Sequence, residues 1–132
     1  MKSQDAQKAL EKAIQCLSDT EIILKNELAL ASVNRAYYTF YYGICALLLS
    51  KEVQTKTHQG IHNKFAELFI KTGIFEKEVN DWVTSSFRFR QLADYDFEAN
   101  ITENEAQEIV SKARQFIDLV KDYFVKNPLP TA

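Results

Sequence analysis

Proline and glycine are scarce in this chain of 132 residues, which contains two prolines and three glycines. Both prolines, Pro128 and Pro130, lie near the C-terminal end, so residues 1–127 are free of the strongest helix breaker. The glycines stand singly at positions 43, 60 and 73, which excludes a glycine-rich phosphate-binding loop. A fold that alternates strands and helices needs turn residues about every ten positions, and they are missing. The sequence therefore predicts an all-α protein.

A strong excess of charge is also missing, because 16 Lys and Arg residues face 18 Asp and Glu residues, for a net charge of −2. Duplex DNA is therefore not expected as a partner. Cys16 and Cys45 form no CxxC pattern and are interpreted as buried thiols rather than a disulfide. The start of the chain lacks the apolar run of a signal peptide, and residues 36–49 are too few to span a bilayer. We expect a cytoplasmic protein that does not contact membranes.

Apolar periodicity predicts a single helical domain over residues 1–132, with a core of about 4–126 and a flexible tail at 127–132. The expected helices cover about 4–25, 28–50, 58–71, 76–97 and 102–127, with Ser3 as the N-cap of the first. Thr102 and Glu105 have the spacing of a capping box. Helices of about 22 residues would be about 33 Å long. These lengths favour an up-and-down antiparallel bundle of four to five helices.

The segment 28–50 has almost no polar face, which is typical of a central helix. We expect it at the middle of the bundle or partly in a homodimer interface. Its third row of small residues, which includes Gly43, would permit close approach of another backbone. The expected core positions of helices 4–25, 28–50 and 76–97 are, in chain order, Leu10, Ile14, Leu17, Ile22, Leu24, Leu30, Val33, Tyr37, Phe40, Tyr41, Ile44, Leu47, Leu48, Val79, Trp82, Val83, Ser86, Ala93 and Phe97.

Three strongly polar residues fall inside these apolar patterns. Arg90 lies in the stripe of helix 76–97, and Asp94 follows one turn later, so the two can pair. Such an arginine is either part of a structural ion pair or a guanidinium that meets phosphate through its planar fork. Asn34 and Arg35 interrupt helix 28–50, and their burial without partners would cost several kcal/mol. Another helix, a second protomer or a ligand must satisfy them.

The polar segment before the third helix carries Lys56, Thr57 and His58, a cation, a hydroxyl and an imidazole at a helix N-terminus, where an anion is favoured. His62 lies one turn after His58, and two imidazoles at this spacing could share a metal. A third ligand is not evident, so no metal and no cofactor are expected. The aromatic run at residues 37–42 could stack nucleobases, although core packing is the simpler interpretation.

Four motifs together resemble those of the HEPN domain family, in its branch of small stand-alone prokaryotic proteins. The resemblance covers about residues 5–125 and rests on their order and spacing. The motifs are Ser32-x-Asn34-Arg35-Ala36-Tyr37-Tyr38 with Phe40-Tyr41, Lys56-Thr57-His58-x-Gly60, Phe69-x-Lys71-Thr72-Gly73, and Arg90-x-x-Ala93-Asp94-Tyr95.

The resemblance implies a bundle of four to five helices that commonly dimerises, with a cleft between protomers. Many HEPN domains are metal-independent ribonucleases, and others bind nucleotides or pair with a minimal nucleotidyltransferase in toxin–antitoxin systems. Active members carry an arginine that holds phosphate and, after four to six intervening residues, a histidine that moves protons. Here the arginine is Arg90, but the histidine is missing and Tyr95 stands at the first of those positions.

Three hypotheses follow. The first is a HEPN-like protein that binds nucleotide or RNA phosphate through Asn34, Arg35, Lys56, His58, Arg90, Asp94 and Tyr95, with a minimal nucleotidyltransferase as a candidate partner. The second is a metal-independent endoribonuclease in which Arg90 acts with His58 or Tyr95. The third is a structural or interaction module. Because the family motif lacks its histidine, the sequence favours binding over catalysis.

Overall fold

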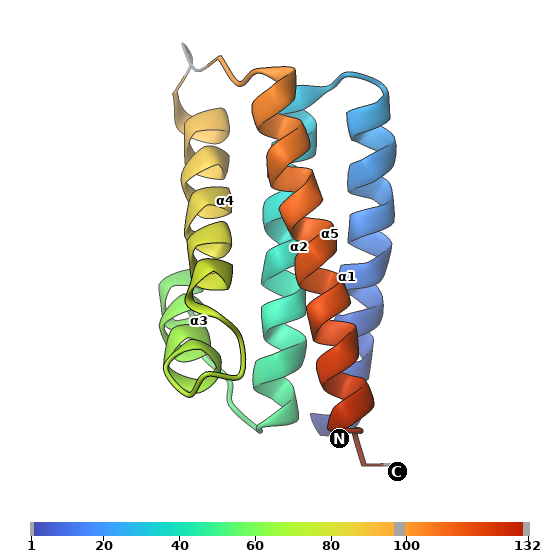
Figure 1. Cartoon of the computed structure of the whole chain (residues 1–132), viewed down its shortest axis with the longest axis vertical. Coiled ribbons are helices and arrows are strands. Elements are labelled where there is room, and N and C mark those ends of the chain that lie inside the picture. The colour runs from blue at the N-terminus through green and yellow to red at the C-terminus, as the bar shows by residue number, and fades with distance from the viewer. Residues whose placement is uncertain (1, 97–99, 131–132) are drawn as a thin grey trace.

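The computed structural model describes residues 2–96 and 100–130, and within these ranges it contains helices and no strands. The elements are α1 (Lys2–Lys25), α2 (Ala29–Ser50), α3 (His58–Phe65), a π-helical turn η1 (Ala66–Ile70), α4 (Lys77–Tyr95) and α5 (Glu103–Lys126). The prediction of an all-α bundle is therefore confirmed, with its long helices running alternately up and down (Figure 1).

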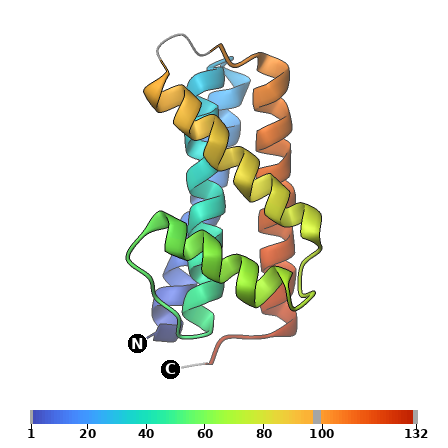
Figure 2. The ribbon, with the colours of Figure 1, turned by 90° about the vertical axis from the view of Figure 1, so that its left-hand side faces the viewer.

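Helices α1, α2 and α5 stand side by side, while α3 and α4 lie across one outer face of this group (Figures 1 and 2). In Figure 2 the green α3 and the yellow α4 slant over the longer helices behind them, with α4 above α3. Helix α2 packs against each of the other four α-helices. It therefore presents different side chains to the core and to the α3–α4 layer.

The core-facing side of α2 follows the predicted stripe. Val33, Phe40 and Ile44 are fully buried, as the alternation of three- and four-residue steps requires for one face of a helix. The predicted row of small residues is largely buried too, and a Cβ atom added at Gly43 would lie 2.8 Å from Phe116 Cε2 of α5. The absence of a side chain at Gly43 thus permits α5 to lie directly against α2.

Three predicted core positions are wrong. Ile14, Ile22 and Leu30 are exposed, Ile22 by 57% and Leu30 by 48%. The buried face of α1 instead includes Ala6 and Ala13, because small side chains allow α1 to approach its neighbours closely. A periodicity analysis that considers only large apolar residues overlooks alanine. It therefore places the buried face of α1 at the wrong angle around the helix axis.

The predicted helix boundaries are close but not identical. Helix α1 begins at Lys2, so Ser3 lies inside its first turn and is not the N-cap. The segment 58–71 is not one α-helix, since α3 passes into η1, where Lys71 N–H donates to the Ala66 carbonyl over five residues at 2.9 Å. Gly73 follows with φ of +80°, as expected for a residue that ends a helix.

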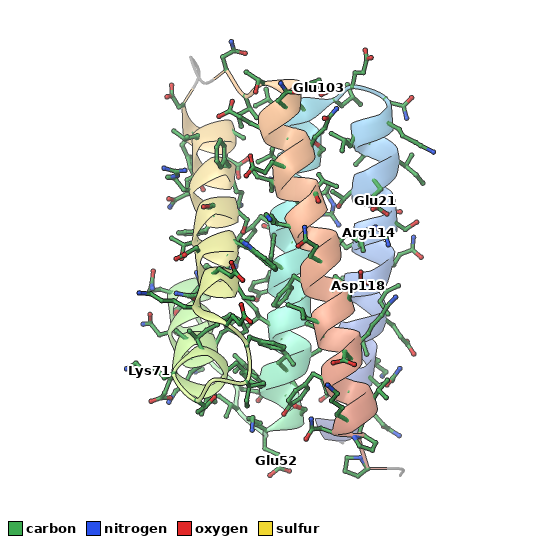
Figure 3. The ribbon with its side chains drawn as sticks, in the orientation of Figure 1. Glu21, Glu52, Lys71, Glu103, Arg114 and Asp118 are labelled. Carbon is green, nitrogen blue, oxygen red and sulfur yellow. The ribbon has the colours of Figure 1, made fainter. Side chains whose placement is uncertain are left out.

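The remaining ends agree with sequence chemistry. Helix α5 begins with the predicted capping box, in which Thr102 and Glu105 each satisfy the other's backbone amide. The predicted core residue Phe97 lies outside the described residues. On the far side from α4, Arg114 of α5 and Glu21 of α1 point toward each other and pair through two hydrogen bonds (Figure 3). None of the helices described is both long and apolar enough to cross a membrane.

Candidate functional site

Tyr37 of α2 is the centre of a polar and aromatic cluster beneath the α3–α4 layer. Its ring is fully buried, yet its hydroxyl reaches two imidazoles of α3. Tyr37 Oη lies 2.7 Å from His58 Nδ1 and 3.3 Å from His62 Nε2. Because His58 and His62 are one turn apart, both side chains leave α3 on the side that faces α2. A single hydroxyl therefore joins the two histidines to the central helix.

Arg90 of α4 approaches the same ring. The central carbon of its guanidinium lies 5.1 Å from the centre of the Tyr37 ring and 5.4 Å from that of Tyr38, both distances typical of cation–π contacts. Its Nη2 donates to the Tyr38 hydroxyl at 3.3 Å. The arginine side chain is 18% exposed, so most of the cation is covered by aromatic surface. Arg90 and His58 thus contact one tyrosine from different helices.

Asp94 links Arg90 to the N-terminal part of α2. One carboxylate oxygen lies 3.2 Å from Arg90 Nε, and the other accepts a hydrogen bond of 3.2 Å from Asn34 Nδ2. The Arg90 Nε atom is buried and forms no aligned hydrogen bond, despite its short distance to Asp94. This ion pair is therefore electrostatic rather than a well-formed charged hydrogen bond.

Arg35 forms its hydrogen bonds with α1 and meets the cluster at the Tyr38 ring. Its Nη2 donates to the Cys16 sulfur of α1 at 3.3 Å, and Cys16 donates back to the Arg35 carbonyl at 3.4 Å. The central carbon of the guanidinium lies 5.6 Å from the centre of the Tyr38 ring. Arg35 thus connects α2 to α1, which is the helix-to-helix alternative that the sequence left open.

Lys56 and Tyr95 lie at the margin of the site. Tyr95 is 73% exposed at the last position of α4. Lys56 is exposed and borders a hollow of about 460 Å³ between α2 and the loop before α3, lined also by Tyr41, Cys45, Leu48, Leu49, Val53, Gln54, Thr55 and Ile61. The Tyr41 ring stacks on His58 at 4.6 Å, so this hollow adjoins the cluster.

Burial controls the ionisation of the cluster. It lowers the pKa of His58, with a further decrease from the Arg90 cation, and it lowers the pKa of His62, with a smaller contribution from His58. Burial also raises the pKa of Tyr37 far above its usual value, although Arg90 opposes this effect. At neutral pH the two imidazoles are therefore neutral and Tyr37 keeps its proton, so each imidazole has one N–H donor and one acceptor.

The two histidines share a hydroxyl group. Within residues 2–96 and 100–130, no group of three or more His, Cys, Asp or Glu side chains could hold a metal ion. Nδ1 of His58 and Nε2 of His62 meet at the Tyr37 hydroxyl instead.

Sequence reasoning misses the roles of Tyr37, Tyr38 and His62. It assigns Tyr37 to the core or to the stacking of nucleobases, because a periodicity pattern shows that a side chain is buried but not where its hydroxyl points. A useful signal is the spacing of His58 and His62, which places two imidazoles on one face of a helix and requires a shared polar partner.

Comparison with known proteins shows which family the chain resembles. The family model described as HEPN domain matches residues 6–123. A relative from Methanocaldococcus jannaschii named "Putative toxin MJ0142" is 34% identical over 121 residues, which cover 92% of this chain and 82% of the relative. The "UPF0332 protein" of Thermotoga maritima is 34% identical over 110 residues, which cover 83% of each chain. The chain therefore belongs to the HEPN domain family.

Proposed function

We propose that this protein binds the phosphate of a nucleotide or of RNA at the surface formed by Asn34, His58 and Arg90, here called the Arg90 face. The observation that carries the proposal is the meeting of Arg90 and His58 at Tyr37. In the family motif the histidine follows the arginine after four to six intervening residues. In this proposal His58 of α3 takes the place of that histidine, because it and Arg90 contact the same tyrosine.

The chemistry of these groups suits phosphate. A guanidinium offers several donors in a planar fork, and its hydrogen bonds to phosphate oxygens are roughly twice as strong as neutral ones. A neutral imidazole adds one further donor without the cost of placing a second cation beside Arg90. Tyr41 and the adjoining hollow offer an aromatic and apolar surface that a nucleobase could contact.

Binding of short RNAs and nucleotides, measured by calorimetric titration, tests the proposal. Arg90→Ala removes one donor group to a charged ligand, worth about 1.5–3 kcal/mol, so the affinity should fall by roughly 10- to 100-fold. The matched control is Arg88→Ala, because Arg88 leaves the same helix toward the hollow shared with α5 and its loss changes the net charge equally. Equal losses in both folded variants, or none in either, would contradict the proposal.

A second function, metal-independent endoribonuclease activity, is favoured by the neutral state of His58. A neutral imidazole near a guanidinium can exchange a proton with a substrate oxygen while the arginine stabilises the phosphate charge. We expect RNA cleavage in EDTA that is lost in both Arg90→Ala and His58→Ala. Tyr95→Phe should cleave normally, because the Tyr95 side chain projects into solvent. If Tyr95→Phe loses cleavage while His58→Ala keeps it, Tyr95 and not His58 moves the proton.

We also propose a homodimer and a minimal nucleotidyltransferase partner in a toxin–antitoxin pair. Two relatives carry the word toxin in their names. Helix α2 retains partly exposed side chains, among them Tyr38, Tyr42 and Leu49, which suit a protein contact. Analytical ultracentrifugation tests the dimer.

Expression of the protein in growing cells tests the toxin–antitoxin pair. We expect growth to stop, and to resume when the product of a neighbouring nucleotidyltransferase gene is also expressed. Unimpaired growth on expression of this protein alone would contradict the pair.

A further inference from the structure

His62 is the polar side chain of the cluster that neither binding nor cleavage at the Arg90 face uses. It is partly buried, with its ring edge against Phe87 of α4 at a centroid distance of 5.1 Å. Its Nε2 reaches the Tyr37 hydroxyl, the same atom that His58 contacts. Two imidazoles that share one hydroxyl cannot both accept its single hydrogen. The nitrogen that carries the proton in each ring must therefore be identified.

The two distances at the Tyr37 hydroxyl indicate which atom donates. Tyr37 has one hydrogen to give, and the contact of 2.7 Å to His58 Nδ1 matches the short bonds that hydroxyl donors form. The contact of 3.3 Å to His62 Nε2 is longer and suits an N–H donor at the weak end of the range. The hydroxyl therefore donates to His58 and accepts from His62. A neutral His58 whose Nδ1 accepts must carry its proton on Nε2.

We propose that His62 and Tyr37 form a hydrogen-bonded relay that fixes His58 with its proton on Nε2, the nitrogen presented to the ligand. The proposal rests on the function proposed for the Arg90 face. His58 Nε2 and His62 Nδ1 are the outer ends of the relay, since the other nitrogen of each ring contacts Tyr37. Neither outer nitrogen is among the buried polar atoms of the described residues that lack a hydrogen bond, so neither is a sealed and unsatisfied group.

The relay can move a proton without forming an imidazolium. The transfers occur together: as His58 Nε2 gives its proton to a ligand oxygen, Tyr37 gives its hydroxyl proton to His58 Nδ1 and receives one from His62 Nε2. His62 Nδ1 takes a proton from a solvent water, which is left as hydroxide. All three groups end neutral with each histidine in its other tautomer, and the reverse sequence, which starts from that state, makes His58 a base.

Charge near the cluster explains why such a path is useful. An imidazolium at His58 would stand close to the Arg90 cation, and burial together with that cation already lowers the pKa of His58. The carboxylate paired with Arg90 is that of Asp94, which is also shared with Asn34. Transfer through Tyr37 avoids adding a positive charge there, and Tyr37 and His62 act as positioning residues.

Nitrogen-15 NMR of the full chain with labelled histidine tests the assignment without any ligand. At neutral pH we expect His58 with Nε2 protonated and Nδ1 unprotonated, and His62 in the same form. Tyr37→Phe should convert His58 to a mixture of both tautomers, because the ring remains while the hydroxyl is lost. Tyr41→Phe is the matched control, since Tyr41 stacks on His58 whereas the hydroxyl that contacts Nδ1 belongs to Tyr37.

Protonation of His58 at Nδ1 in the parent chain, or an unchanged tautomer in Tyr37→Phe, would overturn the relay. If Tyr37→Phe does not fold, His62→Phe serves in its place, because a Tyr37 hydroxyl without the His62 donor can accept from His58 as well as donate. An unchanged His58 tautomer in His62→Phe would also overturn the relay. A correct tautomer combined with equal RNA binding by Arg90→Ala and Arg88→Ala would refute the function of the Arg90 face and leave the relay intact.

Discussion

The contact between Gly43 of α2 and Phe116 of α5 permits a quantitative prediction. A Cβ atom at position 43 would lie 2.8 Å from Phe116 Cε2 and 3.3 Å from Ile117 Cδ1. Ordinary carbon contacts begin near 3.4 Å, so Gly43→Ala requires a displacement of about 0.6 Å. Phe116 is fully buried and packs against Phe40 at a centroid distance of 5.2 Å, so its ring has little room to move.

Two effects of opposite sign set the outcome. Overpacking a tight core costs about 1–3 kcal/mol, whereas alanine in place of glycine inside a helix contributes about 1 kcal/mol. We expect a net loss of about 1 kcal/mol in the free energy of unfolding. For a domain of this size that corresponds to a decrease in Tm of about 4 °C, measurable by circular dichroism. Urea unfolding should show a lower midpoint with an unchanged slope.

A double-substitution cycle isolates the steric cause. In the Phe116→Leu background the obstructing ring atoms are removed, so Gly43→Ala should stabilise the chain by about 1 kcal/mol through helix propensity alone. The sign of the effect thus reverses between the two backgrounds. Stabilisation by Gly43→Ala in the parent chain, or the same loss in both backgrounds, would refute the explanation that this glycine permits close helix packing.

Three further predictions concern the helix cap, the histidines and the hollow. Thr102→Ala should lower the free energy of unfolding by about 1 kcal/mol in urea titrations, whereas Thr84→Ala on exposed surface should not. Because burial lowers the pKa of His58 and His62, the unfolded chain takes up protons first, so stability should fall as pH drops below about 6.5, and double substitution by glutamine should weaken that dependence. Burial raises the pKa of Cys45 to about 11, so its alkylation at about pH 8, followed by peptide mass analysis, should be roughly a hundredfold slower than that of a free cysteine; rapid modification would contradict its burial.

The fold is predictable because one physical signal dominates it. Helix α2 is apolar or small on nearly every side, which leaves only a central position, and the absence of proline before residue 128 removes the alternatives to long helices. The predicted faces fail where alanine packs as tightly as leucine, as at Ala13 beside the exposed Ile14. The π-helical turn at Ala66–Ile70 has no marker in the sequence, since its extra residue is accommodated by tertiary packing.

The site is predictable only in part. Arg90 and Asp94 are close in sequence, so their pairing follows from helical spacing. The contact of Asn34 with Asp94 joins residues 60 positions apart, and that of Arg35 with Cys16 crosses to α1. Adjacent residues such as Asn34 and Arg35 leave a helix about 100° apart, so they form their hydrogen bonds with different helices. The packing of three helices determines which of these two residues points toward α4. No local sequence pattern predicts that packing.

The carboxylate of Asp94 gives the Arg90 face an internal competitor. Because the Asp94 carboxylate lies 3.2 Å from Arg90 Nε, it offsets part of the charge that Arg90 presents to an approaching anion. An arriving anion must offer Arg90 more than a single carboxylate does. A phosphate group with several acceptor oxygens can meet that demand, because it can accept from more than one nitrogen of the guanidinium. The Arg90–Asp94 ion pair would thus favour the binding of anions with several acceptor oxygens over anions with a single acceptor.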